Sequence, residues 1–551
     1  MVFILPTLFV THSAAGERTK LVNEPDVLDI GNRRQVFIDG RFLATSHNME
    51  LIMHPPRKTG ERILSADRPW EGNSIGSYSC VLKVGDTYHL WYPARSGLCY
   101  ARSKDGIQWE KPDLGLADYE GSRNNNIVIG RGAGGIDKCG SEGMVFYDPT
   151  APEDQRFRYA VRISDELKDT VVFSSPDGIH WQLTHKKVLT FTHPEGRQQL
   201  DSQNVIFWDD RINKYVAYMR YNRHVPKGFR GRSIARSESN RLGGFSQVQD
   251  SPIVLAPDSL DASLGDHPVV DYYTNGTIKY PWAQQAYYMF PQVYLHYVQG
   301  EMREFADDYV TNAGPLHTQF AASRDGITWH RFGRRPFVDL GMKGEFDSMC
   351  ARVFYGLVPS VDGKEMYMYY LGSDRLHGWG RDDRNRRLLT AGGLAPTEDV
   401  SVISRLVLRR DGFVSARAAY AGGEFTTPLM RFAGEKLVLN VDTSATGLVR
   451  CELLDREGKP IKGYRLADCD VIHTANQINR QVSWQGQSDV SALAGKPIRL
   501  RIAFRDADLY AFQFMNYTDS TSNVCRVWLN YSKGILCLTR SLSACLKWNP
   551  Y

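Results

Sequence analysis

The sequence predicts an all-β protein, a five-bladed β-propeller followed by a β-sandwich, and two observations support this prediction. First, a seven-residue pattern, Ser-x-Asp-Gly-x-x-Trp, recurs as Ser103 to Trp109, Ser175 to Trp181 and Ser323 to Trp329. Second, the runs before each copy alternate apolar or aromatic residues with polar ones, which is the period of a strand rather than a helix. Four-stranded units that recur at a regular interval are typical of propellers.

The spacing of the copies predicts the number of units. Their aspartates are residues 105, 177 and 325, so the spacings are 72 and 148 residues, and the second is close to twice the first. A decayed copy is therefore expected near residue 251, where Arg236 to Ser239 and Phe245 to Val248 keep the strand and turn pattern. A further unit is expected at Pro396 to Asp399, before an apolar run. Five blades are expected within residues 33–420.

The repeated motif has a structural explanation of its own. Asp-Gly supplies the positive φ that a tight hairpin turn requires, and the tryptophan that follows can pack back over the turn. We therefore expect the aspartates of the three copies to shape turns rather than to act in catalysis.

The pattern changes after the segment Asp411 to Ser415. Short apolar runs at Lys436 to Val441, Gly447 to Leu454 and Ile498 to Phe504 are separated by turn residues. They predict an accessory β-sandwich over residues 421–516. Residues 517–551 continue neither pattern and form a tail to which the sequence assigns no structure.

Composition excludes several classes of function. The formal charge of +5 is spread over 551 residues without a long Lys/Arg run, so binding to nucleic acid is not expected. The nine cysteines form no Cys-x-x-Cys pair, so a zinc site is not expected. No cofactor is expected to be required, while a structural Ca²⁺ stays open.

The N-terminus suggests export. The apolar run Val2 to Val10 is too short to span a bilayer, and Ser13, Ala14 and Ala15 form a small-x-small pattern suited to signal peptidase. Residues 1–15 are thus predicted to be a signal peptide and the protein to be secreted or periplasmic; a frayed N-terminus is the alternative. No segment is predicted to span a membrane, and the oligomeric state stays open.

Candidate catalytic residues follow from propeller geometry. The first residues of the inner strands converge on one mouth of the channel, so acids at these positions can meet. Four acids fulfil this condition: Glu71, Asp201, Asp271 and Asp347. Carboxylates from separate blades suit glycoside hydrolysis, in which one carboxyl donates a proton and another, ionised, activates water or attacks the sugar. We expect Asp201 and Asp347 to form the acid/base pair, and Glu71 or Asp271 to tune or bind.

Residues beside these acids are expected to bind substrate. They are Asp67, Trp70, Gln203, Asn204, Arg220, Trp282, Glu345 and His377. Each also has a structural alternative: Asp67 could cap the turn before Pro69, Trp70 could belong to the core, and His377 could be an ordinary loop residue.

Several segments together resemble a known family. Besides the repeated motif, they are Pro69 to Gly72, Asp201 to Asn204 and Asp411 to Ser415. Over roughly residues 33–514 the chain resembles exported bacterial proteins that are similar to the N-terminal domain of glycoside hydrolase family 32. That five-bladed superfamily is shared with families 43, 68 and 130. The Trp-Met-Asn-Asp-Pro-Asn, Arg-Asp-Pro and Glu-Cys motifs of true family 32 fructosidases are absent, so the resemblance does not imply fructosidase activity.

The resemblance and the acids together predict a secreted glycoside hydrolase that cleaves a poly- or oligosaccharide at the propeller mouth. Two alternatives stay open. One is a propeller that binds glycans without catalysis. The other is a phosphorylase, with a basic cluster that Arg220, Arg223 and His224 could supply, or a polysaccharide lyase, which would use a Tyr/His pair.

Overall fold

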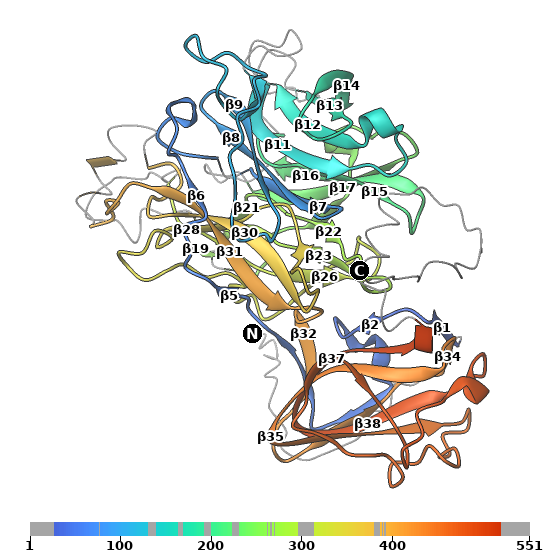
Figure 1. Ribbon diagram of the computed structural model, residues 1–551. Coiled ribbons are helices and arrows are strands. Elements are labelled where there is room, and N and C mark those ends of the chain that lie inside the picture. Colours follow the sequence, from blue (N-terminus) through green and yellow to red (C-terminus); the bar gives the residue numbers. More distant parts are fainter. Residues whose placement is uncertain are drawn as a thin grey trace, which may run out of the picture.

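A computed structural model describes residues 27–518 except 77, 131–138, 164–168, 192–199, 223–230, 262, 265–266, 269, 296–312, 380–385, 388–389 and 391–392. Strands make up most of its elements, so the predicted all-β class is confirmed (Figure 1). Short 3-10 helices occur at Gly40–Phe42, Pro69–Glu71, Glu153–Gln155, Val248–Asp250 and Ser491–Leu493. In the described part, no helix has the length and apolar character needed to cross a membrane. The predicted signal peptide and nearly all of the predicted tail lie outside the described residues.

Four four-stranded antiparallel sheets are arranged as a β-propeller. The first contains β7 (Cys80–Val84), β8 (Thr87–Ala94), β9 (Gly97–Ser103) and β10 (Ile127–Gly130). The second contains β11 (Cys139–Tyr147), β12 (Phe157–Ile163), β13 (Thr170–Ser175) and β14 (Gln182–Leu189). The third contains β15 (Val205–Asp209), β16 (Lys214–Asn222), β17 (Arg232–Ser239) and β18 (Ile253–Leu255), and the fourth β22 (Ile278–Lys279), β23 (Tyr287–Met289), β26 (Ala321–Ser323) and β27 (His330–Arg331).

The prediction of five blades was wrong, because only four such sheets are found in the described residues. The strands expected to form the fifth blade belong to a nine-stranded sheet instead. It contains β5 (Arg57–Lys58), β6 (Leu64–Ser65), β21 (Val270–Tyr272), β24 (Gln292–Leu295), β25 (Leu316–Thr318), β28 (Cys350–Val353), β29 (Val358–Pro359), β30 (Glu365–Ser373) and β31 (Ser401–Arg409). The physical reason is a parallel pairing of β25 with β28, at Leu316 and Cys350, which joins strands that the repeat spacing had separated. A small separate sheet pairs β19 (Ser263–Leu264) with β20 (His267–Pro268).

The repeated motif forms the same turn in all three copies. Asp177 Oδ1 accepts hydrogen bonds from the backbone N–H groups of Ile179 and His180, both at 2.9 Å, and from the Ser175 hydroxyl at 3.0 Å. The turn glycine, Gly178, has a φ of +77°. The turns at Asp105 and Asp325 have the same bonds, so the aspartates shape turns, as we expected from the motif.

Each of these turns also contacts a neighbouring sheet. The indole N–H of Trp91 donates to the carbonyl of Gly178 at 2.7 Å. The hydroxyl groups of Tyr218 and Tyr369 donate to the carbonyls of Gly326 and Gly106 at 2.7 and 2.6 Å. The donors stand on β8, β16 and β30, whereas the acceptors follow β13, β26 and β9. We call these three contacts the turn clasps, since each ties the end of one sheet to the middle of another.

The C-terminal strands form a second nine-stranded sheet together with strands from the start of the chain (Figure 1). Its members are β2 (Gln35–Val36), β3 (Thr45–His47), β4 (Glu50–Met53), β32 (Val414–Ala418), β33 (Gly423–Thr426), β35 (Lys436–Leu454), β36 (Ile472–His473), β37 (Asn476–Gln481) and β38 (Arg499–Met515). Beside it, β1 (Leu28–Gly31) pairs with β34 (Met430–Phe432). Because all nine strands are linked by hydrogen bonds, the pairing does not show a β-sandwich, and the predicted domain limits stay predictions.

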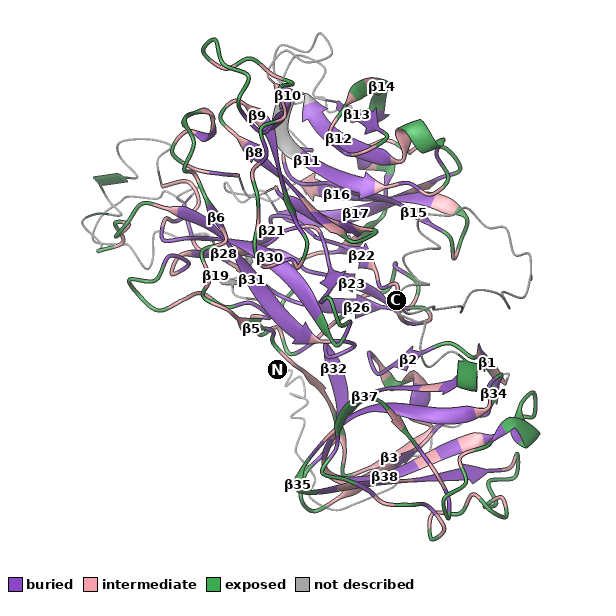
Figure 2. Cartoon of the chain, viewed as in Figure 1, coloured by how far each residue is buried: buried purple, intermediate pink, exposed green. Residues whose placement is uncertain are grey.

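Buried residues form the centre of both parts of the molecule (Figure 2). At the junction between the parts stands Asp411, whose side chain is fully buried. It accepts hydrogen bonds from Arg34, from the Tyr280 hydroxyl at 2.6 Å and from Asn440 at 3.1 Å. Burial by itself would raise the pKa of Asp411, but the charges of Arg34 and Arg410 and these hydrogen bonds outweigh burial and lower it.

A first prediction concerns the turn clasps. We expect Gly178→Ala to lower the thermal unfolding midpoint more than Gly85→Ala. Both glycines have positive φ, +77° and +59°, so each alanine carries a backbone penalty of about 1–2 kcal/mol. A Cβ at residue 178 would lie 2.5 Å from the Trp91 ring, whereas one at residue 85 would meet nothing within 4 Å. Circular dichroism melts measure both, and equal shifts would contradict a role for the close contact.

A second prediction concerns the junction. Asp411→Asn leaves the buried Arg34 without its carboxylate, so we expect a loss of about 3–5 kcal/mol at neutral pH. Because the folded pKa of Asp411 lies below its ordinary 3.8, its stabilisation is present above that pH and is lost as the pH falls through the folded value. The difference in urea midpoint between the wild-type protein and Asp411→Asn should therefore become smaller below about pH 4. A constant difference from pH 7 to pH 3 would show that ionisation of Asp411 is not involved.

Candidate functional site

A group of polar and aromatic residues comes together at one end of the propeller. Within a sheet of antiparallel strands, the start of one strand lies beside the end of the next, so residues at these positions from several sheets can meet. We name this group the mouth cluster. It consists of Tyr78, Arg162, Asp201, Arg220, Arg232, Asp271, Tyr273, Tyr294 and His377.

Asp201 is the carboxylate of the mouth cluster that solvent reaches, with 28% of its side chain exposed. The guanidinium groups of Arg220 and Arg162 lie 3.5 and 3.8 Å from its two carboxylate oxygens. Arg220 is almost fully buried and also donates to the backbone carbonyl of Asp201. Burial and then the neighbouring charge of Arg232 lower the pKa of Arg220, and the charge of Asp201 offsets part of this effect. The site therefore holds adjacent cationic groups beside an accessible carboxylate.

Asp271 lies next to this pair but is buried. The backbone N–H and the guanidinium of Arg232 donate to its two carboxylate oxygens at 2.8 and 2.7 Å. Both side chains are at most 2% exposed. The guanidinium of Arg232 also lies 5.5 and 5.4 Å from the ring centres of Tyr273 and Tyr294. This buried pair fixes Arg232 and the two tyrosines in one arrangement.

Aromatic rings form one side of the mouth cluster. The rings of Tyr78 and Tyr273 are stacked, with an interplanar angle of 12°, and their hydroxyl oxygens are 2.9 Å apart. The His377 ring packs at 4.6 Å from Tyr273 and 5.1 Å from Tyr294, measured between ring centres. Tyr78 is partly exposed, so a sugar ring can approach this side. The structure thus brings together four residues of the sequence prediction: Asp201, Arg220, Asp271 and His377.

Glu71, the third predicted catalytic acid, lies in a different network. Its side chain has no exposed surface. Its carboxylate accepts from the Tyr92 hydroxyl at 2.6 Å, from the backbone of Asp67 at 2.9 Å, and from Lys111 at 2.7 Å. Two predicted binding residues share this surrounding: Asp67 pairs with Lys111 at 2.6 Å, and the indole of Trp70 donates to Asn126 at 2.7 Å. These contacts stabilise the fold, and they do not support a catalytic role for Glu71.

Asp347, the fourth predicted acid, is also engaged elsewhere. Lys58 and the Tyr370 hydroxyl donate to its Oδ2 atom at 2.7 and 2.8 Å, and only 4% of its side chain is exposed. The neighbouring Glu345 accepts from the backbone of Met342 at 2.9 Å. Among the described residues, the hydrogen bonds of Asp347 and Glu71 lead to partners outside the mouth cluster, so the predicted pairing of Asp201 with Asp347 stays without structural support.

The remaining predicted binding residues have packing contacts. The Gln203 amide donates to the carbonyls of Ser79 and Gly143 at 3.0 and 3.1 Å, which ties three inner strands together. Asn204 accepts from the backbone of Arg220 at 2.9 Å. Trp282 packs edge-on against Tyr280, with ring centres 5.2 Å apart. Gln203 and Asn204 therefore position backbone segments beside the mouth cluster, while Trp282 packs in another part of the core.

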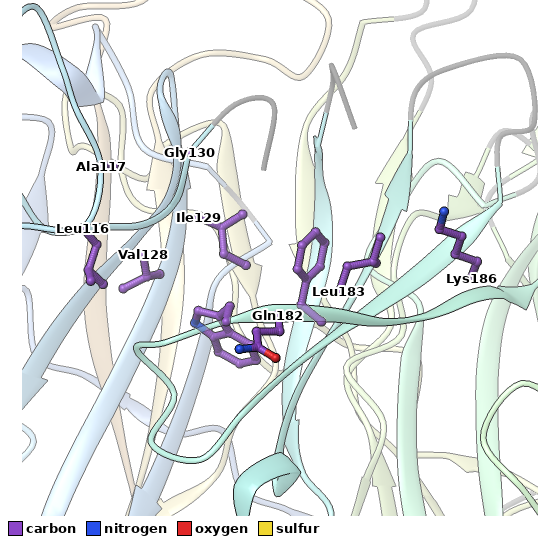
Figure 3. A pocket seen from close by; sticks show the side chains of 10 residues that line it. Leu116, Ala117, Val128, Ile129, Gly130, Gln182, Leu183 and Lys186 are labelled. Carbon is purple, nitrogen blue, oxygen red and sulfur yellow. The ribbon is translucent and has the colours of Figure 1, made fainter. Parts of the chain in front are cut away.

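A groove of about 650 Å³ lies between the outer strands β10 and β14 (Figure 3). Its lining includes the apolar side chains of Val128, Ile129, Phe173 and Leu183 together with the polar Gln182 and Lys186. None of its lining residues belongs to the mouth cluster. Within the described ranges, no group of three or more His, Cys, Asp or Glu could hold a metal ion, and the question of a structural Ca²⁺ stays open.

The sequence prediction missed five members of the mouth cluster. They are Tyr78, Arg162, Arg232, Tyr273 and Tyr294. Four of them stand at or beside an end of a strand, whereas the predicted catalytic residues were all acids. Arg232 begins β17, but Arg162, Tyr273 and Tyr294 stand at or just after the last residues of β12, β21 and β24, so a rule limited to the starts of inner strands does not find them.

Comparison with known proteins yields similarity in structure only. No family model and no curated protein matches the chain. A thermostable family 43 glycoside hydrolase matches at 15% identity and a TM-score of 0.42, covering 64% of this chain and 95% of that one. A family 43 arabinoxylan arabinofuranohydrolase from Bacillus subtilis matches at 11% and 0.36, covering 84% and 98%. An N-acetylgalactosamine deacetylase from F. plautii matches at 12% and 0.42, covering 66% and 96%. Similarity at this level does not define a reaction.

A third prediction concerns the buried pair of the mouth cluster. Arg232→Gln leaves the Asp271 charge buried without its guanidinium, so we expect a loss of about 3–5 kcal/mol in stability. The double variant Arg232→Gln, Asp271→Asn removes both charges and should recover part of that loss. Urea unfolding midpoints of the two variants give the comparison. A double variant less stable than the single one would mean that Asp271 is stabilised by other groups.

Proposed function

We propose that the chain is a carbohydrate-active enzyme of the glycosidase type and that the mouth cluster is its active site. The observation that carries the proposal is the position of Asp201. Of the four predicted acids, it alone combines an exposed carboxylate with a place where residues of several sheets converge, since Glu71, Asp271 and Asp347 are at most 4% exposed. Aromatic rings beside a few charged groups are typical of sugar-binding sites.

The chemistry of the mouth cluster fits cleavage of a glycosidic bond. The transition state develops positive charge at the sugar ring, and the carboxylate of Asp201 can stabilise that charge or activate water. The partly exposed ring of Tyr78, which stacks on the buried Tyr273, can offer a flat surface to a sugar, and its hydroxyl group can offer a hydrogen bond. The Arg232–Asp271 pair holds one of these rings in place. We propose Asp201 as the residue that acts on the substrate and Asp271 as the residue that positions its neighbours.

A second candidate function is phosphorolysis, and one observation favours it. Arg162 and Arg220 lie within 4 Å of Asp201, and a phosphate that replaces water as the attacking group would need such cations. Arg223 and His224, which were predicted to join this basic group, lie outside the described residues. Product analysis separates the two functions, because hydrolysis proceeds in phosphate-free buffer and phosphorolysis does not.

Three further predictions accompany the proposal. Export through a signal peptide at residues 1–15, a catalytic propeller over residues 33–420 and an accessory domain over residues 421–516 stay predictions from the sequence. Sequencing the N-terminus of the mature protein would test the first of these.

The fourth testable prediction separates Asp201 from Asp347. On a glycan that the wild-type protein cleaves, we expect Asp201→Asn to lower kcat by about 10²–10⁴. Its unfolding midpoint should stay unchanged, because the side chain is partly exposed and its ion pairs are long. The matched variant Asp347→Asn should do the opposite, because it removes the partner of Lys58 and Tyr370.

Release of reducing ends and circular dichroism melts measure the two effects. Undiminished cleavage by Asp201→Asn would refute the proposed site. A stable Asp347→Asn variant without activity would move the catalytic assignment to Asp347.

A further inference from the structure

We propose that Arg352 binds an oxyanion substituent of the substrate, a sulfate ester or a carboxylate on the sugar, at the edge of the mouth cluster. This inference rests on the proposed function, since it takes the mouth cluster as the place where the carbohydrate binds. It adds a specificity-determining residue that the sequence did not predict, together with the chemical class of the group that this residue selects.

Arg352 lies on β28 and points to the side of the mouth cluster. Successive side chains of a strand point to opposite faces. Ala351 and Val353 belong to a core cluster on one face, so Arg352 shares the other face with Cys350. Burial raises the pKa of the Cys350 thiol, and the charge of Arg352 offsets part of this effect. Such an effect requires a short distance between the guanidinium and the sulfur atom.

Cys350 links Arg352 to the mouth cluster. It packs with the rings of Tyr273 and Tyr294, and the partly exposed Tyr78 packs against the same group. The chain just after β28 also forms a parallel bridge to the first residue of β7, the strand that Tyr78 precedes. Arg352 therefore lies at the aromatic side of the mouth cluster.

The guanidinium of Arg352 has donors to spare. Its Nε atom is buried without a hydrogen bond, and within the described ranges its terminal nitrogens form neither a hydrogen bond nor an ion pair. The side chain as a whole is half-buried. Arg232, by contrast, is bonded to Asp271 at 2.7 Å. Since donors that are kept from water cost free energy when they stay unbonded, a ligand that accepts from Arg352 gains affinity.

The local charge attracts an anion. The mouth cluster contains three arginines and two aspartates, which are Arg162, Arg220, Arg232, Asp201 and Asp271. With Arg352 the count is four cations to two anions, so these residues carry a net charge of +2 when both aspartates are ionised. A net positive charge of this kind draws anionic ligands to the site and opposes their loss.

The neighbouring ring favours an anion that is attached to a sugar. Positive charge attracts free phosphate as well, but phosphate meets the cation alone. A sugar that bears an oxyanion can place the oxyanion on Arg352 and its own ring on Tyr78. Two contacts within one ligand give a substituted sugar the advantage over a free ion.

Titration calorimetry on the full chain tests the inference in buffer without phosphate. The probes are glucuronic acid, galacturonic acid, glucose and galactose sulfated at the primary hydroxyl, the unmodified glucose and galactose, and inorganic phosphate. We expect at least one acidic sugar to bind about tenfold or more tightly than its neutral parent, the difference that one charge-assisted contact provides. Whether the sulfated sugars or the uronic acids show this preference identifies the substituent.

Variants of Arg352 separate binding from a structural role. Arg352→Gln should remove the preference for the acidic sugar and leave the affinity for the neutral parent unchanged. Arg352→Lys, which keeps the charge but not the planar fork, should retain part of the preference. The thermal unfolding midpoint of Arg352→Gln should stay close to that of the wild-type protein, because no hydrogen bond or ion pair of the guanidinium is lost within the described part of the chain.

The matched control is Arg375→Gln. The charge of Arg375 also acts on the Cys350 thiol, but its guanidinium is paired with Asp399 at 2.8 Å. This variant should keep the preference for the acidic sugar. Loss of the preference in both variants to the same extent would mean that overall charge, rather than a contact with Arg352, selects the ligand.

Three other results would overturn the inference. One is that no acidic sugar binds more tightly than its neutral parent, or that Arg352→Gln folds and keeps the preference. Another is that phosphate binds through Arg352 without any preference for acidic sugars, which would favour phosphorolysis. The last is that Arg352→Gln has a lowered unfolding midpoint and loses neutral and acidic sugars equally, which would make Arg352 a structural residue.

The outcome can be separated from that of the proposed function. Binding is measured without turnover, so an acidic sugar that binds through Arg352 to a protein without glycosidase activity would support the inference and refute the proposed enzyme. Cleavage of neutral glycans that depends on Asp201, without any preference for acidic sugars, would support the enzyme and refute the inference.

Discussion

The carbonyl of a turn glycine is a single acceptor, yet in this protein three of them connect neighbouring sheets. Trp91, Tyr218 and Tyr369 each reach from the middle of one sheet to a turn at the end of another. The turn can accept this bond only because its glycine has no Cβ, and because the preceding aspartate holds the backbone in its bent form. A second set of contacts, from Tyr215 to Asp148 and from Tyr287 to Asp209, links sheets in the same manner. The relative position of the sheets, and with it the mouth cluster, depends on these bonds.

These contacts between sheets hold the residues of the mouth cluster in place. Its residues come from segments as far apart as Tyr78 and His377, and no local sequence motif holds them together. Asp201 is partly exposed, with the guanidinium groups of Arg220 and Arg162 at 3.5 and 3.8 Å from its carboxylate oxygens. Asp271, with the same residue type and a neighbouring arginine, is instead buried and bonded twice. The environment rather than the residue type thus gives the two aspartates different roles.

The sequence predicted local features well and non-local ones poorly. The Asp-Gly turns were predictable because their hydrogen bonds lie within a few residues. The number of blades was predicted wrongly because the parallel pairing of β25 with β28 is not indicated by any repeat in the sequence. Asp201 and Asp271 were found because both stand where a strand begins. Asp347 stands shortly before β28, whereas Glu71 ends the 3-10 helix Pro69–Glu71, ahead of β7. Their lysine partners are 40 and 289 residues away in the chain, and nothing in the sequence marks such partners.

The pairing of β2 with β38 has a consequence for how the protein is made. Gln35 lies opposite Phe512, so a residue near the start of the chain waits for 477 more residues before its partner exists. At roughly 5–20 residues per second, this delay is on the order of 25–95 s. Strand β38 also pairs with β32, β33 and β35, so the C-terminal sheet cannot assemble before the last strand leaves the ribosome. During synthesis the propeller can fold first, while β2 to β4 remain as unpaired edges that chaperones would have to protect.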